Sequence, residues 1–134
     1  MNATPDDVAI RTLTDEWLAA EQARDIDRLL EQVTEDAVFL MPGGRAVSGK
    51  AAIRNLFEAF FASFVSEHTV TIREVQVHGD WAFTWGEEVT VLRPVSGGPA
   101  TQMQGFGCSI LRRGPDGRWR FARGINNMAP GPPR

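Results

Sequence analysis

The chain has 134 residues, of which 43% are hydrophobic and 23% charged, and its formal net charge is −3 at pH 7. This composition is typical of one globular domain, and the slightly acidic balance leaves no basic field for nucleic acid or an anionic membrane surface. The single cysteine, Cys108, excludes an intrachain disulfide.

We expect residues 1–134 to form a single domain, with an ordered core at about 5–127 and a flexible Pro/Gly-rich tail at 128–134. The first ten residues lack a basic segment followed by an apolar one, so no signal peptide is predicted. No apolar run approaches the ~20 residues of a membrane span. A cytoplasmic location is therefore expected.

Two helices are predicted at the start of the chain. Thr4 can cap a helix that begins at Pro5, and Asp25 can cap a short second one. The apolar residues that recur at helical spacing are Ile10, Leu13, Trp17 and Ala20 in the first helix, and Ile26, Leu29, Leu30 and Val33 in the second.

A strand at about 37–41 is followed by a break at Pro42-Gly43-Gly44, since proline lacks a donor and glycine accepts positive φ. Ser48 then fits the N-cap of a third helix. The broad apolar face of this helix comprises Ile53, Leu56, Phe57, Phe60, Phe61 and Phe64. Part of that face is expected to cover a sheet.

The second half of the chain favours β structure throughout. We predict strands at about 68–78, 81–93, 101–112 and 118–127, separated by turns rich in Gly, Pro and Asp. Helices followed by an antiparallel meander predict an α+β fold. Gly105 and Gly107 would permit a strongly bent sheet. Its outer face, near Val75, Val77 and Ile110, favours a homodimer.

The strand at 81–93 contains the strongest candidate for acid/base chemistry. Alternation places Glu87 in one row with Trp81 and Trp85, and in the last strand it places Arg123 in an apolar row with Trp119. A carboxylate in an apolar cavity has a raised pKa, as a general acid or base requires. Three possibilities remain open: a Glu87–Arg123 catalytic pair, a structural ion pair, or a solvated Glu87.

Other polar residues are weaker candidates. The amides of Gln104 and Asn126 could polarise a carbonyl or hold a water, although exposed strand amides are commoner. His68 could face the mouth of a cavity, and His78 is expected in a turn. The sequence has no phosphate-binding glycine motif, no nucleophile elbow and no metal-ligand spacing. No cofactor or metal is expected.

Several weak motifs in order carry a resemblance to a known family. They are WLAAEQARD at 17–25, DAVFLMP at 36–42, Ser48-Gly49 with Ala52-Ile53, and GRWRFARGINN at 117–127. Together they resemble the SnoaL-like branch of the nuclear transport factor 2-like superfamily, most closely its SgcJ/EcaC-type group. This resemblance implies a cone-shaped cystatin-like fold, in which a curved antiparallel sheet wraps a long N-terminal helix and encloses an apolar pocket.

The resemblance also implies a homodimer and a small-molecule ligand, while its members range from isomerases and cyclases to non-catalytic domains. The three acid/base positions of ketosteroid isomerases fall at Trp17, at Met41 and near Cys108 or Ser109, none of which is a tyrosine or an acid. The mechanism of those isomerases is therefore not expected here.

The resulting hypothesis is a protein that binds a small hydrophobic, partly oxygenated molecule. Glu87 and Arg123 would perform cofactor-free cyclisation, isomerisation or hydration. The expected binding residues are Trp17, Met41, Phe57, Trp81, Trp85, Gln104, Trp119 and Asn126. The alternatives are a non-catalytic ligand-binding module and a dimeric interaction module with a structural Glu–Arg pair.

Overall fold

The structure, a computed structural model, describes residues 4–131. The helices and strands, in chain order, are α1 (Pro5–Gln22), α2 (Ile26–Glu31), β1 (Val33–Met41), β2 (Arg45–Ser48), α3 (Lys50–Ser63), β3 (Phe64–His78), β4 (Trp81–Pro94), β5 (Thr101–Arg113), β6 (Trp119–Asn126) and β7 (Ala129–Pro130).

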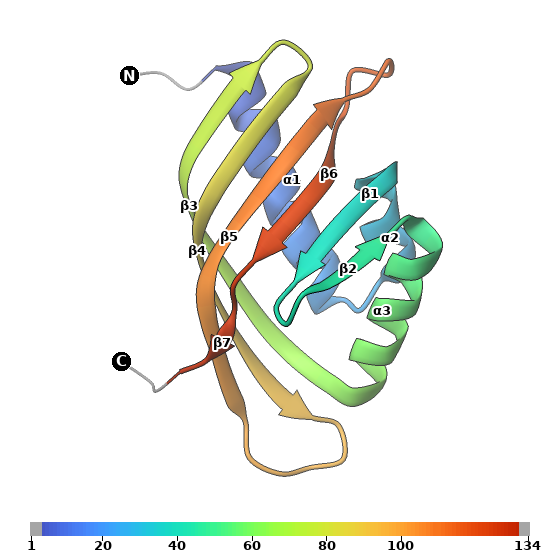
Figure 1. Cartoon of the computed structure of the whole chain (residues 1–134), viewed down its shortest axis with the longest axis vertical. Coiled ribbons are helices and arrows are strands. Elements are labelled where there is room, and N and C mark those ends of the chain that lie inside the picture. The colour runs from blue at the N-terminus through green and yellow to red at the C-terminus, as the bar shows by residue number, and fades with distance from the viewer. Residues whose placement is uncertain (1–3, 132–134) are drawn as a thin grey trace.

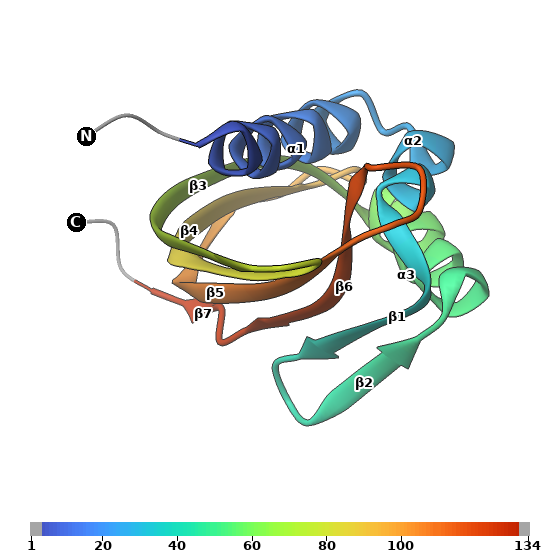
Figure 2. The same cartoon turned by 90° about the horizontal axis from the view of Figure 1, so that it is seen from above.

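The strands form one curved sheet in the order β2-β1-β6-β5-β4-β3, and β7 pairs with β5. All pairings are antiparallel except that of β1 with β6. Figure 2 shows α1 lying across the concave side of the sheet, and Figure 1 shows α2 and α3 beside its β1–β2 end. The predicted α+β architecture, with a curved sheet around an N-terminal helix, is confirmed.

The helix starts follow from local hydrogen bonding at two of three sites. The Asp7 N–H donates to Oγ1 of Thr4 at 3.1 Å, and the Arg28 N–H donates to Oδ1 of Asp25 at 3.2 Å, so both predicted caps are confirmed. The predicted cap at Ser48 is wrong, since Ser48 ends β2 and the N-cap of α3 is Gly49, whose φ of 85° favours glycine.

Three other boundaries differ from the prediction because tertiary pairing extends the strands. β1 begins at Val33 and β3 at Phe64, four residues earlier than predicted in each case. Within the predicted tail, Ala129–Pro130 form β7, which pairs with β5, and the Gly131 N–H donates to the Gln102 carbonyl. Residues 132–134 lie outside the described part of the chain.

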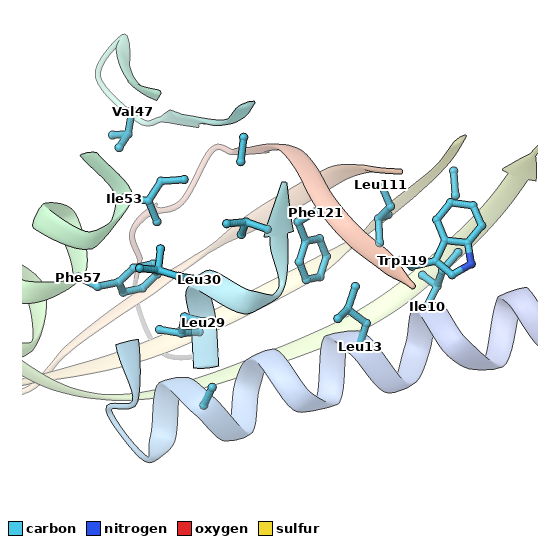
Figure 3. Close-up of a cluster of buried hydrophobic side chains, with 14 of the residues drawn as sticks. Ile10, Leu13, Leu29, Leu30, Val47, Ile53, Phe57, Leu111, Trp119 and Phe121 are labelled. Atoms are coloured by element: carbon cyan, nitrogen blue, oxygen red, sulfur yellow. The ribbon is translucent and has the colours of Figure 1, made fainter. Parts of the chain in front are cut away.

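The hydrophobic core lies between the helices and the concave face of the sheet (Figure 3). Ile10 and Trp119 meet near the N-terminal end of α1, whereas Ile53 and Phe57 of α3 lie farther along the molecule. Trp119 was predicted to line the pocket, which is wrong. It is buried in the core, and its Nε1 donates to Oδ1 of Asp6 at 3.1 Å, which ties β6 to the start of α1.

Candidate functional site

A cavity of about 410 Å³ lies between α1, α3 and the concave face of the sheet. Its walls are mostly aliphatic and aromatic. The lining residues with apolar side chains include Trp17, Phe39, Met41, Leu56, Phe57, Phe60, Val70, Ile72, Leu92, Met103, Phe121, Ile125 and Met128. A volume of this size is typical of sites for small organic ligands.

Three titratable side chains meet in this apolar cavity. His68 Nδ1 lies 2.9 Å from Oε1 of Glu21, and its Nε2 lies 2.8 Å from Oε1 of Glu88. All three residues line the cavity, with side chains only 16%, 10% and 19% exposed for His68, Glu21 and Glu88. We refer to them as the Glu21–His68–Glu88 cluster.

Each member of the cluster comes from a different element. Glu21 lies one helical turn after Trp17 on α1, so both side chains reach the cavity. His68 of β3 pairs with Thr90 of β4, which makes Glu88 its diagonal neighbour on the same face of the sheet. The cluster therefore links α1 to two adjacent strands.

The hydrogen bonds set the protonation state of the histidine. Burial would lower the pKa of His68, but the hydrogen bonds from its ring to Glu21 and Glu88 outweigh that effect and raise the pKa to about 10. A ring nitrogen facing a carboxylate must donate, and here both do. His68 is therefore an imidazolium at neutral pH, held between two carboxylates.

Gly107 of β5 makes room for the Glu88 carboxylate. A Cβ at this position would overlap Oε2 of Glu88 and lie 2.6 Å from its Cδ. Both Gly107 and Glu88 line the cavity. The absence of a side chain at 107 thus lets Oε2 of Glu88 pack against β5 while Oε1 accepts from His68.

This arrangement suits proton transfer better than metal binding. The two carboxylates bind opposite nitrogens of one ring, so they do not converge on a common point. Among residues 4–131, no cluster of three or more His, Cys, Asp or Glu side chains is arranged to hold a metal ion. A carboxylate with a spare oxygen in an apolar cavity can instead remove a proton from a bound molecule.

The predicted Glu87–Arg123 pair does not exist. Glu87 lies on the outer face of the sheet, where its carboxylate pairs with Arg73 at 2.8 Å, and this guanidinium lowers the Glu87 pKa. Arg123 instead donates to the backbone carbonyls of Asp36 and Ala122. Neither residue lines the cavity, so their predicted placement there is wrong.

Glu87 was predicted on the wrong face of the sheet because the sequence does not show which face of β4 is turned inward. Ala82, Thr84 and Gly86 are buried and face inward, so the aromatic row of the strand faces outward. Trp81 is 48% exposed, with the Arg112 guanidinium over its ring. The concave face has to accommodate α1 and the cavity, so it carries the small residues, whereas the convex face has space for the large ones.

The remaining predicted binding residues divide into three groups. Trp17, Met41, Phe57 and Asn126 line the cavity, in agreement with their predicted positions. Trp85 borders the cavity, but its exposed indole donates to Oε1 of Glu74 at 2.8 Å. Gln104 and Trp81 do not line the cavity.

The sequence contains a partial signal for the residues that the prediction missed. His68 was considered only for the mouth of a cavity, and Glu21 and Glu88 were not considered as site residues. Gly86, Gly105 and Gly107 cluster on neighbouring strands around Glu88. Such a concentration of glycines marks a place where a side chain approaches the backbone closely.

The chain is similar to known proteins in sequence family and in fold. A family model for the SnoaL-like domain matches residues 14–122. No curated protein sequence matches the chain. Within residues 4–131, none of the helices combines the length and apolar character needed to span a membrane.

Solved structures with a similar fold cover nearly the whole chain. A conserved protein from Planctomyces limnophilus is 32% identical, with a TM-score of 0.89 over 94% of this chain and 98% of that one. A putative aromatic ring hydroxylase from Novosphingobium aromaticivorans is 26% identical, with a TM-score of 0.80 over 97% and 96%. A Nostoc punctiforme protein described as having a cystatin-like fold is 19% identical, with a TM-score of 0.79 over 99% and 98%, which shows the fold alone.

Proposed function

Because the chain belongs to the SnoaL-like domain family, whose members include isomerases, dehydratases and cyclases, we propose that its cavity binds a small hydrophobic, partly oxygenated molecule and transfers protons on it without a cofactor. The observation that carries the proposal is the Glu21–His68–Glu88 cluster, which is almost buried in an otherwise apolar cavity of about 410 Å³.

In this proposal Glu88 is the group that exchanges a proton with the ligand. It is the more exposed of the two carboxylates, and its Oε2 is not the atom bonded to His68. His68 supplies a positive charge that stabilises the carboxylate, and Glu21 fixes the ring from the helix side. Removal and return of a proton is the chemistry of isomerisation, cyclisation and dehydration.

The neighbouring glutamates allow a matched test of this role. Nitrobenzisoxazole is a neutral, flat molecule that a base opens by removing its ring C–H proton as the N–O bond breaks, giving a coloured cyanonitrophenolate. We expect Glu88→Gln to lower the rate of this reaction by about a hundredfold, within the usual range for a general base. Glu87→Gln, which changes the adjacent exposed carboxylate, should leave the rate unchanged. Equal rates for the two variants would contradict the assignment.

A non-catalytic role for the same cavity is the second candidate. Both ring nitrogens of His68 are engaged by carboxylates, so the histidine has no free N–H for a ligand, as expected of a structural clamp between α1 and the sheet. In that case a ligand would bind and no product would form from it. Membership of the SgcJ/EcaC-type group and a cytoplasmic location stay predictions.

We also propose that the protein is a homodimer formed through the outer face of the sheet. Trp85 and Phe106 pack edge to face there, and Phe106 is 54% exposed. Ile110 is on the same face, whereas Val75 and Val77, which were predicted to support the dimer, pack against the core. A second copy of this face would cover these side chains.

Sedimentation equilibrium measures this association. The wild-type protein should sediment as a dimer at micromolar concentration, and Phe106→Asp should shift it to a monomer because a carboxylate would be buried without a partner. Val95→Asp, in an exposed loop outside this face, is the control. A monomeric wild-type protein would contradict the dimer.

A further inference from the structure

The cavity carries an unbalanced charge. Among its lining residues the charged side chains are Glu21, His68 and Glu88, and no arginine or lysine lines it. Within residues 4–131, the only ion-pair partner of either glutamate is His68. Two carboxylates and one imidazolium therefore leave one net negative charge in a largely apolar enclosure.

The hydrogen bonds around His68 favour this charge. Each ring nitrogen of His68 lies within hydrogen-bond distance of a carboxylate oxygen, so with both carboxylates ionised each nitrogen donates and the ring is cationic. The same bonds use one oxygen of Glu21 and one of Glu88. Among the contacts of residues 4–131 no other hydrogen bond engages the second oxygens, and that of Glu88 lies against Gly107 of β5.

An isolated charge in an apolar cavity is unfavourable unless a partner of opposite sign compensates it. Trp17 and Phe57 line the same cavity, and their rings meet edge to face with centroids 5.7 Å apart. Aromatic faces attract ammonium groups, most strongly where water is excluded. The cavity thus combines a net negative charge, free carboxylate oxygens and aromatic walls.

We infer that the preferred ligand of the cavity is a small apolar molecule bearing a protonated amine. This inference rests on the proposed function, since it requires the cavity to be a ligand site, and it adds a protonated amine to the hydrophobic ligand proposed there. An ammonium group would neutralise the net charge and donate to the free carboxylate oxygens. A neutral alcohol would gain only a hydrogen bond, and a carboxylate would be repelled.

Three probes of one shape separate these cases: naphthylmethylamine, naphthylmethanol and naphthoate. Their affinities are measured at pH 7.5 by isothermal titration calorimetry. We expect the amine to bind about tenfold more tightly than the alcohol, and the carboxylate more weakly than either. Glu88→Gln removes the net negative charge and should abolish the preference for the amine, while Glu87→Gln should preserve it. Val70→Trp, which fills part of the cavity, should weaken all binding.

The outcomes distinguish the inference from the function on which it rests. An alcohol that binds as tightly as the amine, together with a lower nitrobenzisoxazole rate for Glu88→Gln, would overturn the inference and leave the proposed function intact. An amine preference that survives in Glu88→Gln, or an amine affinity that is unchanged in Val70→Trp, would also overturn it, because the amine would then bind elsewhere. Failure of all three probes to bind, with no effect of Glu88→Gln on the rate, would overturn both.

Discussion

Replacing His68 with glutamine is expected to lower the free energy of unfolding by about 3–5 kcal/mol at pH 7, the usual consequence of removing one member of a buried ion pair. The imidazolium lies between Glu21 and Glu88 at 2.9 and 2.8 Å, and the side chains of all three residues are less than a fifth exposed. A neutral amide would leave two carboxylates facing each other without a cation.

Removal of the two carboxylates tests whether unpaired charge is the cause of the expected loss of stability. If unpaired charge is responsible, the triple variant Glu21→Gln/His68→Gln/Glu88→Gln should recover much of the lost stability, because no buried charge remains. His78→Gln is the matched control, since His78 is exposed at the end of β3 and should stay within about 0.5 kcal/mol of the wild type. Denaturant unfolding of the four proteins supplies the comparison. A His68→Gln variant as stable as the wild type would contradict a charged cluster.

The same contacts make stability depend on pH in a defined window. The pKa of His68 rises from an ordinary 6.5 to about 10 in the folded protein. Folding therefore strengthens proton binding, so this contribution to stability is complete below pH 6.5 and is lost as the pH rises towards 10. The difference in unfolding free energy between wild type and His68→Gln should shrink over this window, and a constant difference would show that the proton on His68 is not involved.

Gly107→Ala is the second large effect we expect. The added methyl group would overlap Oε2 of Glu88, so the carboxylate would have to leave β5 and lose its 2.8 Å hydrogen bond to His68. Overpacking of this kind usually costs about 1–3 kcal/mol, and the lost charged hydrogen bond adds to it. The pKa of His68 should also fall, since one of the two hydrogen bonds that raise this pKa is lost.

A double-mutant cycle isolates the contact between Gly107 and Glu88. In a Glu88→Ala background the methyl group of Gly107→Ala meets no carboxylate and should cost little. Gly124→Ala on β6 is the control, because a Cβ there meets the Phe39 ring at an ordinary 3.4 Å. An equal effect of Gly107→Ala with and without the Glu88 side chain would contradict a clash between the added methyl group and this carboxylate.

Local chemistry made much of the fold predictable. Thr4 and Asp25 cap helices because their side-chain oxygens satisfy free N–H groups, which depends only on neighbouring residues. The alternation in β4 separated two faces correctly. It could not tell which face is inside, because Trp81 and Trp85 lie outward only as a result of α1 and the cavity occupying the concave side.

The candidate site was not predictable in the same way. Glu21, His68 and Glu88 are separated by 47 and 20 positions and come from α1, β3 and β4. No spacing rule connects them, and the curvature of the sheet decides that they meet. Glu87 was predicted as the acid/base residue because it interrupts an apolar row, yet its neighbour Glu88 is the one that faces the cavity.

The proposed site depends on His68 being a cation held between two carboxylates inside the cavity. Nitrogen NMR of ring-labelled histidine at pH 8 tests it directly, because the chain contains only His68 and His78 and the His78→Gln variant assigns both signals. We expect both ring nitrogens of His68 to carry protons at this pH, which lies well below the His68 pKa of about 10. A neutral His68 ring, with one unprotonated nitrogen at pH 8, would contradict it.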